Sequence, residues 1–359
     1  MTHSIPYLGA STTRIPELDG MRGIAILLVM VFHSNLAILK GGFIGVDIFF
    51  VLSGFLITVL LLEEFDENNT ITLNEFYFRR FLRLAPALLL LLSAVAILSS
   101  VFLSGVDRKD QFIDVLISLL NVSNWARAFS LHPPTYLGHT WSLSLEAQFY
   151  FIWPLVFAGV LKTSRSRCHL VLLGLIVGLW GSRIYLALNG TSFERLYNGL
   201  DTRMDMLLSG SLLAVLLRSN LVTFYQKKIA LVLKYIAPVS ALLLLWISAV
   251  ADWRELSFYY WGMPAIEILV CSIILNIRLV ENSFLKNILS NKLFVWIGGI
   301  SYGLYLWHYP VYALMTTLKF TNLTILVVGS AITFILAFLS SCLIEKPIIR
   351  RGKKYLVMS

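Results

Sequence analysis

An arginine and a histidine lie eleven residues apart in the apolar segment at residues 19–35, DGMRGIAILLVMVFHSN. Eleven residues make almost three turns of an α-helix, so Arg22 and His33 share one face and lie roughly 16 Å apart along the axis. An arginine suits an anion and a histidine suits a proton. The pair therefore predicts an anion site and a base at two depths of a membrane. A topological anchor plus a histidine hydrogen-bonded between helices is the structural alternative.

The next apolar segment, residues 41–57 (GGFIGVDIFFVLSGFLI), contains the acidic residue Asp47. An ionisable group at membrane depth costs about 3 kcal/mol, so it predicts a partner or a function. His33 on the adjacent antiparallel helix lies at a compatible depth. A carboxylate on one ring nitrogen would fix the tautomer and raise the basicity of the other nitrogen. An aspartate that caps its own helix is the alternative.

Two arginines three residues apart, Arg80 and Arg83, lie in the segment FYFRRFLRLAP at residues 76–86. They share one face at the start of a predicted helix. Helix N-termini favour anions, and each guanidinium group can donate to two oxygens, so the pair predicts a phosphate site. An anchor that contacts lipid phosphate is the alternative.

A run of polar residues occurs at residues 138–154, GHTWSLSLEAQFYFIWP. We expect Trp141 at the outer mouth of a membrane span, with Ser144, Glu146 and Tyr150 further in. Glu146 and Tyr150 are four residues apart on one helix face, which favours the wall of a hydrophilic cavity. Hydrogen bonds between helices are the alternative.

Two weaker candidates lie later in the chain. Arg203 and Asp205, in DTRMDMLLSG, could form an ion pair or contact a sugar. His308, in ISYGLYLWHYP, is expected to be a packed histidine before a proline kink. The three cysteines are scattered, and the sequence has no metal-binding, nucleophile-elbow or nucleotide-binding motif, so we predict no metal.

Membrane-spanning helices must position these residues. The 359 residues are 58% hydrophobic and only 14% charged, well below the roughly 25% of charged residues in a soluble domain. We therefore expect an all-α polytopic membrane protein, and nucleic-acid binding is excluded because basic residues do not cluster with aromatic ones. Ten segments are predicted to span the membrane: 23–39, 43–62, 84–104, 143–161, 169–188, 204–217, 229–250, 261–280, 293–315 and 324–344.

Basic residues set the orientation of these spans. With the N-terminus in the cytoplasm, most of the 29 Lys and Arg residues lie on the cytoplasmic side, so the net charge of +9 reflects topology. Both termini are therefore expected in the cytoplasm, with Arg22 at the cytoplasmic face and His33 beyond mid-depth. Residues 112–120 are too short to span and are expected to be interfacial or re-entrant.

Together these stretches make the chain resemble acyltransferase family 3, the bacterial integral-membrane O-acyltransferases. The family's arginine–histidine pattern falls on Arg22 and His33. Its paired arginines fall on Arg80 and Arg83, and the glutamate of its tryptophan–serine motif falls on Glu146. The matching pieces occur in the family's order over residues 15–351: ELDGMRGIAILLVMVFH, GGFIGVDIFFVLSGFLIT, FYFRRFLRLAP, GHTWSLSLEAQFYFIWP, DTRMDMLLSG, ISYGLYLWHYP and EKP.

The resemblance implies a multi-pass protein of the bacterial cytoplasmic (inner) membrane with a cytoplasmic acyl-CoA donor, most simply acetyl-CoA. Arg22, Arg80 and Arg83 would bind its phosphate-rich head, and the pantetheine arm would carry the thioester about 16 Å deeper to His33. His33 would act as general base on the acceptor hydroxyl group. An acyl-His33 intermediate is the competing route, and neither route requires a metal.

Asp47 or Glu146 would orient His33 and complete the catalytic set. The acceptor would arrive from the extracytoplasmic side and would be a glycan, a lipid-linked sugar or a secondary metabolite, with membrane lipid nearby. The candidate acceptor-binding residues are Trp141, Ser144, Tyr150, Arg203 and Asp205.

Residues 1–359 are expected to form one integral-membrane domain, without the soluble SGNH hydrolase-like domain that some family members carry. The alternative function is a proton-coupled transporter or permease, which also needs buried ionisable residues. A paired-arginine site on one face with a histidine at mid-depth, and no inverted repeat, favours group transfer.

Overall fold

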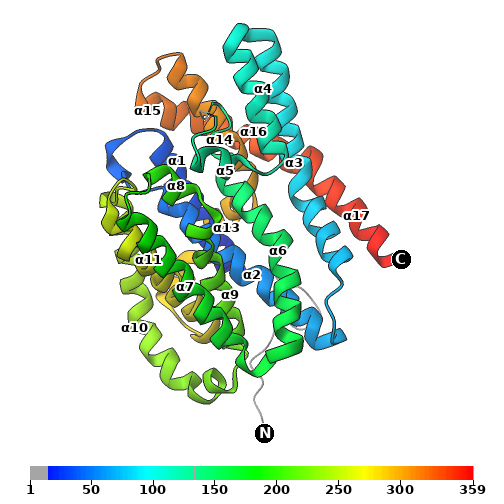
Figure 1. The fold of residues 1–359 in the computed structure, drawn as a ribbon, viewed down its shortest axis with the longest axis vertical. Coiled ribbons are helices and arrows are strands. Elements are labelled where there is room, and N and C mark those ends of the chain that lie inside the picture. The colour runs from blue at the N-terminus through cyan, green and yellow to red at the C-terminus, as the bar shows by residue number, and fades with distance from the viewer. Residues whose placement is uncertain (1–14, 133–134, 359) are drawn as a thin grey trace.

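The computed structural model describes residues 15–132 and 135–358, and every regular element in these ranges is helical. The helices form one bundle, from which α17 extends toward the C-terminus (Figure 1). The first half contains α1 (Pro16–His33), η1 (Ala37–Leu39), α2 (Ile44–Asn68), α3 (Leu73–Phe102), α4 (Gly105–Leu119), α5 (Ser123–Ala128), α6 (Thr140–Ser164), η2 (Arg165–Arg167) and α7 (Cys168–Leu188). The second half contains α8 (Phe193–Asn198), η3 (Leu200–Thr202), α9 (Met204–Leu217), α10 (Asn220–Val250), η4 (Phe258–Gly262), α11 (Met263–Leu279), α12 (Phe284–Leu289), α13 (Lys292–Gly299), α14 (Ser301–Thr317), α15 (Asn322–Thr324), η5 (Ile325–Gly329), α16 (Ser330–Ser340), η6 (Ser341–Glu345) and α17 (Lys346–Met358).

Seven helices in the described ranges are long and apolar enough to cross a membrane. Each overlaps one of the predicted segments, which confirms a multi-pass, all-helical membrane protein. They are Ile44–Asn68, Leu73–Phe102, Thr140–Thr163, Cys168–Leu188, Phe224–Val250, Phe258–Leu279 and Asn322–Gly352.

Three other predicted membrane spans do not form a single long apolar helix in the structure. The first begins earlier than predicted, at Pro16, and carries charged side chains in its opening turns. The segment 204–217 is a short helix, α9, and the segment 293–315 is broken at Ile300 into α13 and α14. The short apolar piece predicted at 112–120 is not a separate element, because it belongs to the longer helix α4, which begins at Gly105.

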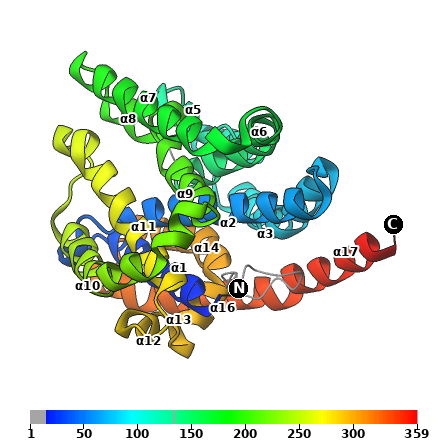
Figure 2. The ribbon, with the colours of Figure 1, turned by 90° about the horizontal axis from the view of Figure 1, so that it is seen from below.

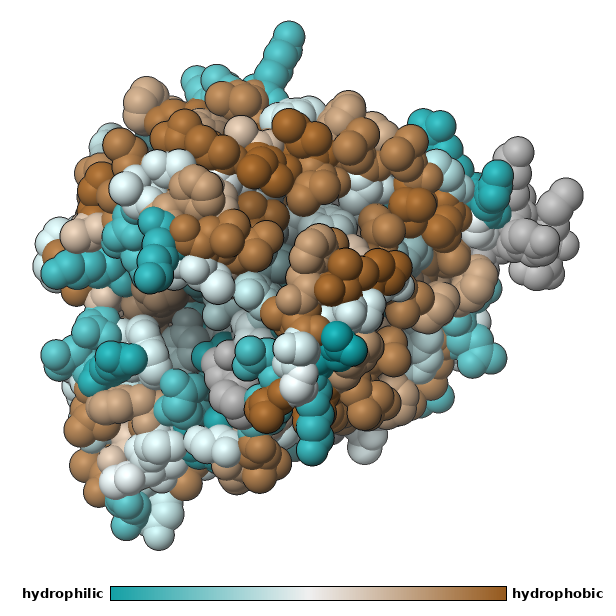
Figure 3. All heavy atoms as spheres, turned by 90° about the horizontal axis from the view of Figure 1, so that it is seen from above, coloured by the Kyte–Doolittle hydropathy of each residue, from teal (hydrophilic) through white to brown (hydrophobic). Residues whose placement is uncertain are grey.

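Helix α2 is the most buried of the seven long apolar helices in the described ranges. Within the described residues, 83% of its most apolar window is buried inside the protein, against 17% for α7 and 22% for α10. Accordingly α2 lies amid the other helices when the bundle is seen from below (Figure 2). Apolar side chains cover much of the upper face, and paler and teal, more polar residues gather around a hollow in it (Figure 3). Exposed apolar side chains on α7 and α10 suit contact with lipid.

Glycines allow two helix pairs to approach closely. A Cβ atom on Gly54 of α2 would collide with the carbonyl oxygen of Leu207 in α9, and one on Gly210 would collide with that of Val51. Gly23 of α1 is similarly close to α13. Small residues let membrane helices pack backbone against backbone. These contacts fix α1 and α2, which carry the first site residues of the chain.

Candidate active site

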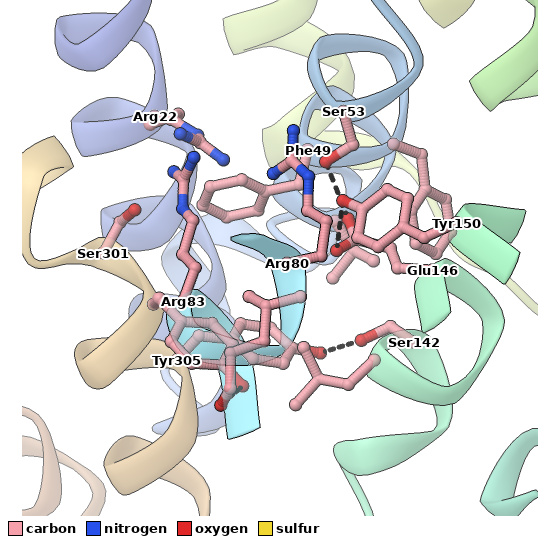
Figure 4. A pocket seen from close by; sticks show the side chains of 15 residues that line it. Arg22, Phe49, Ser53, Arg80, Arg83, Ser142, Glu146, Tyr150, Ser301 and Tyr305 are labelled. Atoms are coloured by element: carbon pink, nitrogen blue, oxygen red, sulfur yellow. Dashed lines mark hydrogen bonds between the residues drawn. The ribbon is translucent and has the colours of Figure 1, made fainter. Parts of the chain in front are cut away.

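An arginine-lined cavity lies among α1, α2, α3, α6 and α14. Its volume is about 580 Å³, including the part open to solvent. Arg22 comes from α1, whereas Arg80 and Arg83 come from one face of α3, and all three side chains line the same space (Figure 4). We call this space the arginine cavity. The structure thus brings together the three residues proposed to bind the donor.

The positive charge of the arginine cavity exceeds its negative charge. None of its three arginines forms an ion pair with a carboxylate in the part of the chain that the structure describes. The buried Nε atom of Arg22 has no hydrogen-bond partner among the residues that the structure describes. Glu146 is the acidic residue among the described residues that line the cavity. Arg22 and Arg80 are half-buried and Arg83 is exposed. Because guanidinium groups bind phosphate oxygens through charge-assisted hydrogen bonds, the cavity is suited to an anionic ligand such as a phosphate group.

Glu146 is held in the cavity wall by two hydroxyl groups. Its carboxylate accepts hydrogen bonds from Ser53 Oγ at 3.0 Å and from the hydroxyl group of Tyr150 at 3.1 Å (Figure 4). The guanidinium carbon of Arg80 lies 5.5 Å from the ring centroid of Tyr150, a cation–π distance. The wall therefore positions one of the arginines as well as the carboxylate.

Three histidines lie together at another place in the bundle. His308 Nε2 in α14 lies 3.1 Å from His33 Nδ1 at the end of α1. The ring of His139, which precedes α6, lies 5.6 Å from the ring of His308. Tyr309 lies beside all three rings, with its centroid 5.1 Å from those of His33 and His139 and 6.3 Å from that of His308. We call this group the histidine cluster. Among the described residues, no His, Cys, Asp or Glu side chains are grouped in a way that could hold a metal ion.

Tyr305 connects the histidine cluster with the arginine cavity. Its side chain lines the cavity, and its ring centroid lies 5.3 Å from that of His308. Its hydroxyl group donates to the backbone carbonyl of His139 at 3.1 Å and lies 2.5 Å from Ser142 Oγ. A single aromatic side chain therefore contacts both polar groups.

The buried carboxylates Asp47 and Asp205 have partners other than those expected. Asp47 is paired with Arg203, and Arg183 Nη1 lies 2.5 Å from Asp205 Oδ2. All four side chains are fully or almost fully buried. The considered pairings of Asp47 with His33 and of Arg203 with Asp205 are therefore not the ones formed. Each buried charge still has an opposite charge beside it, as the cost of burial requires.

Trp141 lies in a protein contact rather than at an open outer mouth. Its side chain is 5% exposed, and its ring centroid lies 4.9 Å from that of Tyr197. The guanidinium carbon of Arg203 lies 5.7 Å from the Trp141 ring and 4.8 Å from the Tyr197 ring. The aromatic rings of Trp141 and Tyr197 thus lie against the buried arginine.

Ser144 also faces a neighbouring helix. Its hydroxyl group lies 2.8 Å from Ser123 Oγ of α5 and donates to the carbonyl oxygen of Thr140 at 3.1 Å. This is the interhelical hydrogen bonding that was considered as the alternative for this segment. Of the five candidate acceptor-binding residues, Tyr150 lines the arginine cavity.

Three residues near the site were assigned no part in it from the sequence. His308 was expected only to pack, and Ser142 and Tyr305 were given no individual role. Tyr305 and His308 are three residues apart, a spacing that places them on one helix face. Two polar aromatic residues on one face of an apolar segment were the signal that could have identified them.

The fold and the two polar groups define a multi-pass helical membrane protein with a cationic cavity beside a histidine cluster. The family model described as an acyltransferase domain matches residues 15–344. The chain therefore belongs to this acyltransferase family, which confirms the resemblance seen in its motifs.

Relatives of the chain are found in several bacteria. The peptidoglycan O-acetyltransferase OatA of Listeria monocytogenes is 38% identical over 94% of this chain and 56% of its own length. A Bacillus subtilis relative, YrhL, is 36% identical over 94% of this chain and 55% of its own length. Its name describes it, by inference, as a peptidoglycan O-acetyltransferase. A Staphylococcus aureus relative with an inferred O-acetyltransferase name is 33% identical over 95% and 58%. The chain thus spans slightly more than half the length of these relatives. No solved structure matches it.

Proposed function

We propose that the chain transfers an acetyl group from acetyl-CoA to a hydroxyl group of a cell-envelope glycan. The observation that carries this proposal is the contact of Tyr305 with both the arginine cavity and the histidine cluster. Transfer from a phosphate-bearing donor needs one site that binds the phosphate groups and a base at a second site. A single donor molecule must be long enough to reach from one site to the other. Coenzyme A fits this need, because its phosphates and its thioester lie at opposite ends of a long, thin arm.

The donor is held by the arginine cavity. Arg22, Arg80 and Arg83 bind the phosphate groups of acetyl-CoA, since their charge is not balanced by carboxylates of the described chain. The pantetheine arm then runs along α1 toward His33, roughly 16 Å away by helix rise. Glu146 holds Tyr150 in the cavity wall and keeps Arg80 in place.

The transfer step uses His33 as general base. His33 Nε2 takes the proton from the acceptor hydroxyl group while the oxygen attacks the thioester carbonyl carbon. The tetrahedral intermediate then breaks its C–S bond, and the departing CoA sulfur takes the proton from His33. The products are an O-acetyl ester and free CoA. In the competing route, His33 itself carries the acetyl group between donor and acceptor.

The acceptor is peptidoglycan or its lipid-linked precursor. The relatives from Listeria and Bacillus carry peptidoglycan O-acetyltransferase names, which supports this choice over a secondary metabolite. We place the protein in the bacterial cytoplasmic (inner) membrane as one integral-membrane domain. In this arrangement both termini are cytoplasmic, and α1, α9 and α14 complete ten crossings with the seven long helices.

The test uses purified full-length protein in lipid nanodiscs with radiolabelled acetyl-CoA and peptidoglycan fragments. The wild type is expected to transfer label to the glycan and to release free CoA, whereas His33→Ala should do neither while its thermal unfolding stays cooperative. Label transfer by folded His33→Ala would overturn the proposal. Absence of CoA release by the wild type, together with uptake of a solute into vesicles, would support the transporter instead.

A further inference from the structure

His308 is the nearest ionisable neighbour of His33. Its side chain is fully buried in α14, whereas His33 is half-buried. The two rings lie 5.0 Å apart with 48° between their planes, and His308 Nε2 lies 3.1 Å from His33 Nδ1. What this contact does depends on which ring nitrogens carry protons, and the surrounding carbonyl groups determine that.

Two backbone carbonyls assign the tautomer of His308. Its Nδ1 atom lies 2.7 Å from the carbonyl oxygen of Tyr305 and 3.2 Å from that of Leu304. Carbonyl oxygens only accept hydrogen bonds, so Nδ1 must carry the proton. In the neutral ring, Nε2 is then unprotonated and presents a lone pair to His33.

The same reasoning assigns the tautomer of His33. Its Nδ1 atom lies 3.1 Å from the carbonyl oxygen of Val29 and 3.1 Å from His308 Nε2. Both neighbours are acceptors, so His33 Nδ1 carries the proton and donates to them. The remaining nitrogen, Nε2, therefore has a free lone pair. This is the nitrogen that a general base needs for the acceptor hydroxyl group.

Aromatic side chains hold the two rings in this relation. Tyr309 meets the His33 ring edge-on, with centroids 5.1 Å apart and 88° between the planes. Phe32 contacts the same ring from another side at 5.0 Å. Rotation of the His33 ring would break the hydrogen bond to His308 as well as these contacts.

We propose that His308 is a positioning residue for His33, an inference that rests on the proposed function. It fixes the tautomer in which His33 Nε2 is the free base. When Nε2 takes the proton from the acceptor, the Nδ1–H group keeps its hydrogen bond to His308, which stabilises the imidazolium ion. The proton then leaves from Nε2 to the CoA sulfur, so His308 neither gains nor loses a proton.

The kinetic test compares His308→Leu with His308→Gln in nanodiscs at neutral pH. Leucine removes the acceptor, whereas glutamine can place an oxygen near the position of Nε2. We expect kcat to fall by about 10- to 100-fold in His308→Leu with the KM for acetyl-CoA unchanged, and to recover in large part in His308→Gln. The matched control is Tyr312→Phe, which removes a buried hydroxyl group from the same helix, where it contacts Ser330 at 2.6 Å, and should retain wild-type kcat.

Several outcomes would overturn the inference. Wild-type kcat in folded His308→Leu would do so, as would equal losses in the leucine and glutamine variants, because packing alone would then explain them. If His33→Ala is inactive while His308→Leu is active, this inference fails and the proposed function stands. If His33→Ala is active, the proposed function itself fails.

A spectroscopic measurement tests the tautomer without any change to His308. Solid-state NMR of protein labelled with ¹³C,¹⁵N-histidine distinguishes protonated from unprotonated ring nitrogens and, through their bonded ring carbons, Nδ1 from Nε2. The difference between the spectra of the wild type and His33→Asn should contain one protonated Nδ1 and one unprotonated Nε2 from His33. The opposite assignment would overturn the inference, even if His308→Leu failed to fold.

Discussion

The hydroxyl groups of Tyr305 and Ser142 lie 2.5 Å apart, where α14 meets α6. Both hydroxyl groups also lie within hydrogen-bond distance of the carbonyl oxygen of His139, Tyr305 at 3.1 Å and Ser142 at 3.3 Å. A short chain of hydrogen bonds therefore joins the wall of the arginine cavity to the backbone of the histidine cluster. The position of one group is thus coupled to the position of the other.

This coupling predicts the effect of Tyr305→Phe. Phenylalanine keeps the ring beside His308 but loses both hydrogen bonds of the hydroxyl group. We expect a fall in kcat of about tenfold, because partners outside the reacting groups commonly contribute that much. The control is Tyr77→Phe, whose hydroxyl group donates to the backbone carbonyl of Phe151 at the surface. Equal rates for the two variants would show that the Tyr305 hydroxyl group is dispensable.

The arginine cavity predicts a loss of donor affinity when Arg80 and Arg83 are both replaced by alanine. Acetyl-CoA should raise the unfolding temperature of the wild type but not of the double variant, because a ligand stabilises only the state that binds it. Arg79→Ala is the matched control, since Arg79 pairs with Glu75 at 3.0 Å and is absent from the cavity lining. An equal shift in all three proteins would return these arginines to the role of lipid anchors.

The buried pair of Asp47 and Arg203 predicts a large effect on stability. Asp47→Ala leaves a buried guanidinium ion unpaired, so the free energy of unfolding should fall by about 3–5 kcal/mol. The exposed Asp107→Ala serves as the control and should change it little. Chemical denaturation in mild detergent measures both.

A double variant separates this structural role from catalysis. Asp47→Leu combined with Arg203→Met removes both buried charges, so part of the stability should return. If Asp47 acts only through the fold, acetyl transfer should recover along with stability. A stable but inactive double variant would instead restore Asp47 to the catalytic set.

Close packing at Gly54 predicts that valine there is not tolerated. Its side chain would collide with the backbone of α9, so we expect a loss of about 3 kcal/mol or a failure to accumulate folded protein. Gly178→Val, at an exposed position of α7 with open space around it, should change stability by about 0.5 kcal/mol at most. Comparable unfolding temperatures for the two variants would contradict the packing argument.

The sequence allowed much of the architecture to be predicted, because long apolar segments have few alternatives in a membrane. It also identified Arg22, Arg80 and Arg83, since spacing along a helix determines which side chains share a face. Their convergence in one cavity needed the packing of α14 against both α1 and α3, which spacing alone does not give.

Partner choice among buried charges was the part that sequence could not supply. Asp47 and His33 were expected at compatible depths, but depth leaves the direction of each side chain around its helix undefined. Arg203 reaches Asp47 because Gly54 and Gly210 bring α2 and α9 together. The break at Ile300 was missed for a related reason, since hydropathy measures apolar length and not backbone continuity.

Helix α2 carries both Ser53, in the cavity wall, and Asp47, in a buried ion pair. Sliding α2 would separate Asp47 from Arg203 in an apolar interior, so we do not expect α2 to move when a ligand enters. Helix α3 is far less buried than α2, with 28% of its apolar window buried among the described residues. We therefore expect a bulky nucleotide to enter and leave the cavity by outward movement of α3. Arg80 and Arg83, which lie on α3, would then move together with the bound nucleotide.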